Sequence, residues 1–275
     1  MLLEPERAVL VRRAVRGGDR FGSGVHVFNT AVLTARHCTN GRDLHVLFDG
    51  RWLPVTAVQT LGEDVDLALL TVDGIPPVEA LDVVHLDRSR AMSLEGCVAL
   101  GFPRWKLGAS GDRYLAHVSG WIPVLDGLGA IPGPESNKAS LRLQDPATRP
   151  APRGAMSRTQ WAGMSGAGVY WRSGADDYLV GILCEHPVAE GDQSLALTPM
   201  SVITSKTLGG DFFAAMGVFN WRSLRHAPAV EDRTIQRLHR IAAVVNLGLV
   251  GPEAARELQV NVMMKDLMDG GLDVI

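Results

Sequence analysis

Ser165 stands in a run of small residues at positions 161–168 (WAGMSGAG) that suits the presentation of a nucleophile. Glycines allow the backbone to turn sharply and its amides to point at a ligand. A serine hydroxyl is a weak nucleophile until a neighbouring base takes its proton. The rest of the sequence must therefore supply a histidine and a carboxylate if Ser165 is to attack a carbonyl carbon.

Two apolar runs carry such residues at their ends. His37 lies at the end of residues 32–38 (VLTARHC), and Asp66 opens residues 66–72 (DLALLTV). A lone histidine such as His37 is more often a structural or surface residue than a catalytic base. A lone aspartate that opens an apolar strand, such as Asp66, can equally be a simple turn residue. Attack on an amide needs a base, an anion that fixes the tautomer of that base, and donors for the oxyanion. Together the candidates meet these requirements.

Two other acids compete with Asp66 for the role of the orienting carboxylate. Asp64 precedes it by two residues in the same strand phase, and Asp73 follows the far end of the run. Asp66 is favoured because the sequence LALL follows it directly.

Three blocks in this order resemble the trypsin-like (chymotrypsin-fold) serine peptidases. Residues 34–38 (TARHC) match a Thr-Ala-x-His-Cys block, residues 66–70 (DLALL) match an Asp-Leu-Ala-Leu-Leu block, and residues 163–167 (GMSGA) are close to Gly-x-Ser-Gly-Gly. The resemblance extends from about Gly22 to Pro199. It implies an all-β fold of two packed six-stranded barrels with the active site between them.

The resemblance also implies a role for each site residue. Ser165 would be the nucleophile, His37 the general base and then acid, and Asp66 the orienting carboxylate. The amides of Gly163 and Ser165 would form the oxyanion hole. No cofactor or metal is expected, and other histidines and cysteines do not have metal-ligand spacings.

Three further segments look most like the bacterial HtrA-like branch of the family: residues 46–50, 99–103 and 196–199. No PDZ-like carboxylate-binding motif follows residue 200, so we expect this branch without a PDZ domain.

Departures from the secreted members of the family indicate a different control. Met164 stands where those members have an aspartate, and an Ile-Val-Gly-Gly activation start is absent, so we do not expect an N-terminal amine to switch the site on. Cys38 has no cysteine in the preceding strand to pair with. The three cysteines do not suggest a disulfide framework.

Substrate preference is weakly encoded. By resemblance, Thr159 lies at the floor of the specificity pocket and His186 near one wall. An uncharged floor argues mildly against Lys or Arg, and the pair would suit an acidic or polar side chain. The alternative is that both are ordinary loop residues.

The strand and turn pattern divides the chain into two β units and a tail. Barrel one is expected at about 20–88 and barrel two at about 95–200, within a peptidase domain of residues 1–222. An Asp49-Gly50 pair predicts a hairpin. The segment before Arg20 is expected to be a solvated arm or edge strand. Residues 200–222 and 231–247 have helical patterns, which makes residues 223–275 a small helical region for docking or regulation.

Composition limits the function classes. A formal charge of −3 gives no electrostatic reason to expect nucleic acid, and the sequence contains no apolar run long enough to span a membrane. Without a signal-peptide pattern, the expected setting is a reducing, bacterial cytoplasm.

The function expected from these residues is hydrolysis of peptide bonds in protein or peptide substrates. One alternative is a protease fold that has lost turnover and only binds peptides. Another gives the tail the main role, with Arg233, Arg237 and Arg240 contacting nucleic acid, which the acidic balance disfavours. Control of the site is expected from a regulatory protein partner at the C-terminal helices or from ordering of the long loops. The alternative for the tail is that it simply packs against the second barrel.

Overall fold

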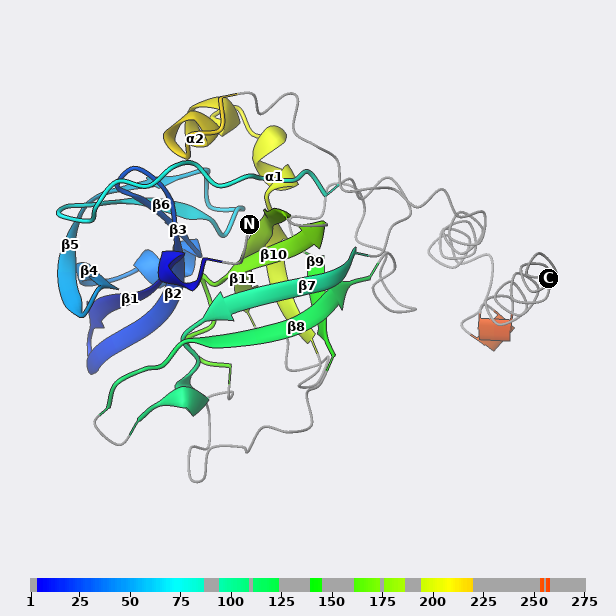
Figure 1. Cartoon of the computed structure of the whole chain (residues 1–275), viewed down its shortest axis with the longest axis horizontal. Coiled ribbons are helices and arrows are strands. Elements are labelled where there is room, and N and C mark those ends of the chain that lie inside the picture. The colour runs from blue at the N-terminus through cyan, green and yellow to red at the C-terminus, as the bar shows by residue number, and fades with distance from the viewer. Residues whose placement is uncertain are drawn as a thin grey trace.

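The computed structural model describes residues 4–86, 94–108, 111–123, 139–144, 161–173, 176–185, 194–219, 253–254 and 256–257. Within these residues the chain forms two closed six-stranded antiparallel barrels, as the resemblance implied (Figure 1).

The first barrel, blue and cyan in Figure 1, has the strand order β1-β2-β3-β6-β5-β4. Its strands are β1 (Ala8–Val15), β2 (Gly18–Phe28), β3 (Ala31–Thr34), β4 (Arg42–Phe48), β5 (Arg51–Thr60) and β6 (Ala68–Val72). The second barrel has the order β10-β11-β12-β9-β8-β7. Its strands are β7 (Leu94–Gly101), β8 (Ala116–Ile122), β9 (Ala139–Leu143), β10 (Gly168–Ser173), β11 (Asp176–Glu185) and β12 (Ser194–Pro199).

Local turn chemistry sets the register of the first barrel. Asp49 and Gly50 have φ values of 46° and 73° and join β4 to β5. Positive φ at both central residues is the requirement of the tight hairpin turn that this pair predicts, so that prediction is confirmed. Pro54 lies directly before a bulge between Val55 and Ala57, where proline is tolerated within a sheet.

The expectation for the segment before Arg20 is wrong. This segment forms β1, which pairs with β2 on one side and β4 on the other and so closes the barrel. Val9, Leu10 and Val11 are buried there. The basic Arg12 guanidinium is accommodated because it stacks 4.4 Å from the centre of the Trp52 ring.

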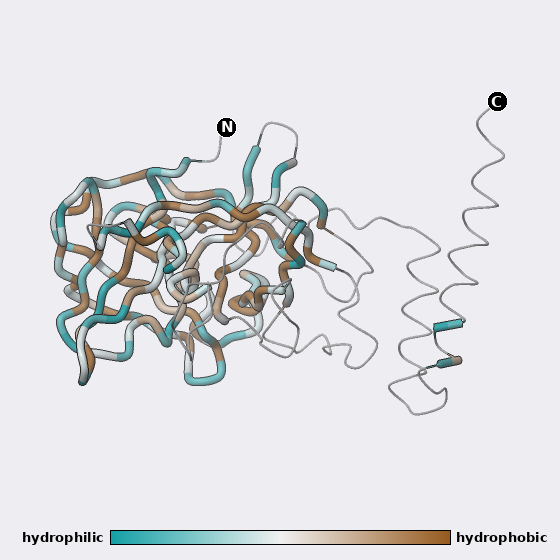
Figure 2. Tube along the Cα trace, turned by 90° about the horizontal axis from the view of Figure 1, so that it is seen from below, coloured by the Kyte–Doolittle hydropathy of each residue, from teal (hydrophilic) through white to brown (hydrophobic). Residues whose placement is uncertain are grey.

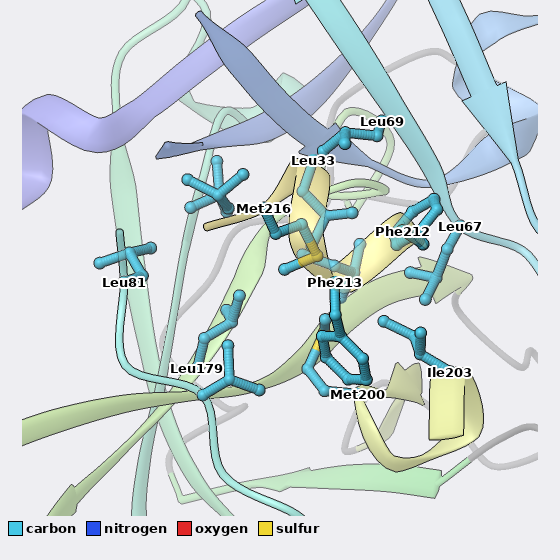
Figure 3. Close-up of a cluster of buried hydrophobic side chains, with 14 of the residues drawn as sticks. Leu33, Leu67, Leu69, Leu81, Leu179, Met200, Ile203, Phe212, Phe213 and Met216 are labelled. Carbon is cyan, nitrogen blue, oxygen red and sulfur yellow. The ribbon is translucent and has the colours of Figure 1, made fainter. Parts of the chain in front are cut away.

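A hydrophobic cluster joins the two barrels (Figure 3). It combines Leu33, Leu67 and Leu69 from the first barrel with Leu179 from the second. Phe212, from the helix after the second barrel, lies among them. Brown, hydrophobic stretches recur along much of the described chain (Figure 2). Because this cluster spans the junction, it fixes the edge of β6 against the second barrel.

Two short helices follow the second barrel, α1 (Ser201–Thr204) and α2 (Gly209–Ala215), as the pattern of residues 200–222 predicts. Nearly all of residues 223–275 lies outside the described residues, as does the predicted helix 231–247. Among the described helices, none has the length and hydrophobicity needed to cross a membrane.

Candidate active site

Pairing of β3 with β6 brings His37 next to Asp66. Thr34 at the end of β3 lies opposite Ala68 at the start of β6, so the residues just beyond these ends meet at one barrel edge. His37 belongs to a 3-10 turn, η2 (Arg36–Thr39). Asp66 Oδ1 accepts the His37 backbone N–H at 2.9 Å, and Asp66 Oδ2 lies 2.7 Å from His37 Nδ1. An ionised Asp66 therefore keeps the proton on Nδ1 and leaves Nε2 for a partner.

Ser165 lies in the turn that precedes β10. Gly163 and Gly166 have φ values of 101° and 91°, which favour glycine. A Cβ on Gly166 would also lie 1.8 Å from the Ser23 carbonyl oxygen. Within the described residues, neither the Gly163 amide nor the Ser165 amide donates to a backbone or side-chain acceptor. Both amides are thus available to a ligand oxygen.

The Ser165 hydroxyl does not contact His37. It donates instead to the Cys184 carbonyl oxygen at 2.9 Å. The nearest partner of His37 Nε2 is Cys38 Sγ at 3.6 Å, and this sulfur also lies 3.5 Å from the Ser165 backbone oxygen. The structure thus brings His37 and Asp66 into direct contact. It places the Ser165 backbone beside Cys38, the chain neighbour of His37, with the Ser165 hydroxyl hydrogen-bonded to Cys184.

Each member of the His37–Asp66 pair stabilises the charged form of the other. Burial lowers the pKa of His37, but the hydrogen bond to Asp66 and the contact with Cys38 outweigh it and raise the pKa above its usual range. Burial raises the pKa of Asp66, but the bonds and charge of His37 lower it below its usual range. A neutral His37 able to accept a proton is therefore favoured by alkaline pH.

The two competing acids lie in other environments. Asp64 is exposed and pairs with Lys206 of the segment between α1 and α2. Asp73 follows the far end of β6, where its backbone N–H donates to the Pro54 carbonyl oxygen. Of the three acids, only Asp66 contacts His37 among the described residues. Thr159 and His186, the predicted pocket residues, lie outside the described residues.

Ser23 is a site residue that sequence reasoning missed. Its hydroxyl donates to the Gly163 carbonyl oxygen at 2.7 Å and accepts the Phe102 backbone N–H at 2.9 Å. Its backbone N–H donates to the Ser165 carbonyl oxygen at 2.7 Å. Ser23 is fully buried, so these bonds tie β2 of the first barrel to the Ser165 turn of the second.

Replacing Ser23 with alanine is expected to reduce both stability and turnover. The change leaves the Gly163 carbonyl and the Phe102 amide without their partner, at a cost of about 1–3 kcal/mol. It also loosens the peptide that precedes Met164, and labelling of Ser165 by a fluorophosphonate should slow. Urea unfolding and labelling rate measure the two effects. Exposed Ser119 on β8 provides the control, Ser119→Ala, which should change neither. An unchanged labelling rate in Ser23→Ala would show that Ser23 only joins the two barrels and does not influence the reactivity of Ser165.

The Cys38 side chain lies directly against Gly22. A Cβ built on Gly22 would lie 2.6 Å from Cys38 Sγ and 3.2 Å from Cys38 Cβ. At 2.6 Å from Cys38 Sγ, the Cβ of a residue that does not bond to this sulfur would clash with it. In a disulfide, the Cβ of one cysteine lies close to the sulfur of the other, so a cysteine at position 22 suits this spacing. Cys38, Cys97 and Cys184 are all buried, and no disulfide joins them.

Gly22→Cys is therefore expected to form a disulfide with Cys38 under oxidising conditions. Closing the loop between these positions stabilises the fold by about 3 kcal/mol in the chain-entropy account. Thermal unfolding with and without a reductant measures the gain. Gly22→Ala is the matched control, because it adds the Cβ without the bond and should only destabilise. If both thiols of Gly22→Cys still react with a thiol reagent after oxidation, the pairing is wrong.

Met164 lies in the apolar core of the second barrel. Its side chain is 2% exposed and packs in a cluster with Trp161, Ala167 and Val169. Met164 has no carboxylate with which an N-terminal amine could form an ion pair. Among the residues that the structure describes, no group of three or more His, Cys, Asp or Glu side chains is arranged to hold a metal ion.

Comparison with known proteins agrees with the fold. Two solved structures are similar to this chain, each over 78% of its length with a TM-score of 0.50. One is the active form of the Rv3671c protease from M. tuberculosis, 16% identical over 82% of that chain. The other is kallikrein-related peptidase 10 in complex with Zn2+, 18% identical over 97% of that chain. No curated protein matches the sequence.

A family model decides the assignment. The model of the trypsin-like peptidase domain matches residues 22–182, which is more than half of the chain. This range contains His37, Asp66 and Ser165. The chain therefore belongs to the trypsin-like peptidase family.

Proposed function

We propose that this peptidase is a serine endopeptidase that works through Ser165, His37 and Asp66. The observation that carries the proposal is the paired contact of Asp66 with the ring and the backbone of His37, beside a serine in a turn with two available amides. A carboxylate that accepts from Nδ1 leaves Nε2 as the basic nitrogen. That nitrogen lies on the side of Cys38 and the Ser165 backbone.

Reaction begins when the Ser165 side chain turns from the Cys184 carbonyl toward His37. Nε2 takes the hydroxyl proton as Oγ forms a bond to the substrate carbonyl carbon. The resulting oxyanion accepts hydrogen bonds from the Gly163 and Ser165 amides. His37 then gives its proton to the leaving amine, and the C–N bond breaks to leave an acyl-enzyme. Water, deprotonated by His37, releases the acyl group.

The second candidate is a peptide-binding module without turnover. The orientation of the Ser165 hydroxyl favours it, because the hydroxyl donates to Cys184 rather than to His37. An enzyme would overcome this with a single rotation about the Ser165 Cα–Cβ bond, whereas a silent module would keep the present orientation with a peptide bound.

Labelling with a fluorophosphonate separates the two candidates. We expect the wild-type chain to be labelled at Ser165, as located by mass spectrometry, and His37→Ala to remain unlabelled. His117→Ala is the matched control, since His117 is an exposed residue of β8, and it should label like the wild type. A wild-type chain that binds peptides but never takes the label is a binding module.

Further assignments in our proposal rest on the sequence. The HtrA-like branch is favoured by residues 46–50, 99–103 and 196–199. Residues 223–275 are proposed to dock a regulatory partner, in a bacterial cytoplasm. If a chain ending at residue 222 keeps the activity, partner binding and oligomeric state of the whole, the docking role is wrong.

A further inference from the structure

A short hairpin after β7 lies against the turn that carries Ser165. Leu107 pairs with Arg113 in an antiparallel bridge, and two more backbone hydrogen bonds of 2.8 and 3.1 Å join the two sides. The Arg104 backbone N–H donates to the Ala162 carbonyl oxygen at 2.7 Å, which attaches the hairpin to the turn. The backbone of Arg113 is thereby fixed relative to Ser165.

The half-buried side chain of Arg113 reaches the edge of the oxyanion hole. A Cβ built on Gly163 would lie 2.6 Å from Arg113 Nη1, so the guanidinium lies directly against this glycine. Nη1 donates to the Phe102 carbonyl oxygen at 3.3 Å. The guanidinium carbon lies 4.8 Å from the centre of the Phe21 ring. These three contacts hold the cation in place and, within the described residues, leave most of its N–H donors without an acceptor.

No anion balances this cation in the described part of the chain. Burial lowers the pKa of Arg113, and the charge of Arg104 lowers it further. Neither guanidinium forms an ion pair with a carboxylate of the described residues. Arg172 shows the contrast, since two of its nitrogens lie 3.0 and 3.3 Å from the oxygens of Asp177. Two neighbouring cations without a counter-ion attract an anionic group.

The position of Arg113 relative to His37 shows which part of a substrate it would meet. His37 hands its proton to the leaving amine, so the residues after the scissile bond begin beside this imidazole. Cys38 lies next to His37, and Gly22 lies against Cys38. Phe21, which precedes Gly22, carries the Arg113 guanidinium on its ring. If the chain cleaves peptides as proposed, the leaving segment would therefore extend from His37 past Cys38 and Phe21 toward Arg113.

We propose that Arg113, assisted by Arg104, binds a carboxylate in the segment that follows the scissile bond. The carboxylate belongs to a Glu or Asp side chain within the first residues of that segment, or to a peptide terminus there. This inference rests on the proposed function, because it uses the direction in which a cleaved peptide leaves. It makes both arginines specificity-determining residues of the site.

Peptides that differ only after the scissile bond test the proposal. One set carries Glu, Gln or Lys at the second residue of the leaving segment, and another ends there as a free acid or an amide. We expect kcat/KM for Glu to exceed that for Gln by about tenfold, as for a charge-assisted hydrogen bond. A larger gain with the free acid than with Glu would identify the terminal carboxylate as the source.

Each enzyme variant is assessed by the ratio of kcat/KM for the Glu peptide to kcat/KM for the Gln peptide. A loss of activity that affects both peptides equally leaves this ratio unchanged. The ratio should fall toward one in Arg113→Gln, fall in part in Arg104→Gln, and be largely restored by Arg113→Lys. Arg172→Gln is the matched control, because it removes an exposed arginine of β10 and should keep the wild-type ratio. An equal ratio in the wild type and in Arg113→Gln would overturn the proposal.

A binding measurement separates this proposal from the proposed function. Fluorescence anisotropy with intact peptides on Ser165→Ala measures the Glu-to-Gln ratio of Kd without any cleavage. A wild-type chain that takes the fluorophosphonate label but shows no preference in binding or cleavage refutes the subsite alone. A chain that is never labelled but binds Glu peptides more tightly, in an Arg113-dependent way, refutes the catalytic function and keeps the subsite.

Discussion

Ser165→Ala is expected to abolish peptide cleavage while leaving the fold intact. In our proposal the hydroxyl is the atom that forms the acyl-enzyme, and loss of such a nucleophile lowers kcat by about a million-fold. The serine side chain makes one hydrogen bond within the described residues, to the Cys184 carbonyl. Losing that bond costs about 1 kcal/mol, so the unfolding midpoint should move little.

Purified wild-type and Ser165→Ala chains, assayed with a mixed peptide library and by thermal unfolding, measure both parts of this result. The amides of Gly163 and Ser165 remain in the variant, so peptides should still bind. Ser119→Ala again serves as the control. Full activity in pure Ser165→Ala would show that another group forms the acyl bond and would refute the mechanism.

The sequence was sufficient to predict the features that depend on local chemistry. Asp49-Gly50 forms its tight turn because few residue pairs adopt positive φ twice. The order of apolar runs predicts two β units, and both close into six-stranded barrels. His37 and Asp66 each stand next to a strand end, and the pairing of β3 with β6 makes these ends neighbours.

Features that depend on tertiary contacts were not predictable in the same way. The arginines before Arg20 led to the wrong expectation of a solvated arm or edge strand. The strand β1 accommodates Arg12 by stacking it on Trp52, and the sequence does not indicate this tertiary contact. Ser23 lies in an ordinary-looking GSG segment, and its importance comes from Gly163 and Phe102, which are far away in the chain. No local pattern reports a hydroxyl shared between two barrels.

The contact between Cys38 and His37 has a similar origin. Cys38 follows His37 directly in the sequence, and the structure buries its side chain. That its sulfur lies 3.6 Å from Nε2 follows from the backbone of η2 and from the space left by Gly22. The thiol is therefore part of the environment that sets the protonation of His37.

Asp66→Asn is expected to lower kcat by about four orders of magnitude with little change in binding. Asp66 accepts from both the backbone and the ring of His37, and an asparagine has one acceptor oxygen for these two donors. Its NH2 group instead favours the imidazole tautomer that carries the proton on Nε2, which cannot accept the Ser165 proton. Asp64→Asn is the matched control, because it removes an exposed acid of the same segment that pairs with Lys206. Equal activity of Asp66→Asn and the wild type would exclude Asp66 as the orienting acid.

The pH dependence gives the same substitution a second, independent readout. In the wild type the pKa of His37 lies above its usual range, so kcat/KM should rise with pH from neutral into the alkaline range. Without the carboxylate, the main remaining influence is burial, which lowers the pKa of His37. The rise of residual activity with pH should therefore begin at a lower pH in Asp66→Asn than in the wild type.

Stability has the opposite pH dependence. The raised pKa of His37 stabilises the fold below the pKa of an unfolded histidine, about 6.5. This contribution is lost as pH rises through the pKa of His37 in the folded chain. The difference in unfolding free energy between wild type and Asp66→Asn, measured by urea titration, should therefore be larger near pH 6 than at alkaline pH. A difference that grows with alkaline pH would mean that Asp66 does not stabilise a protonated His37.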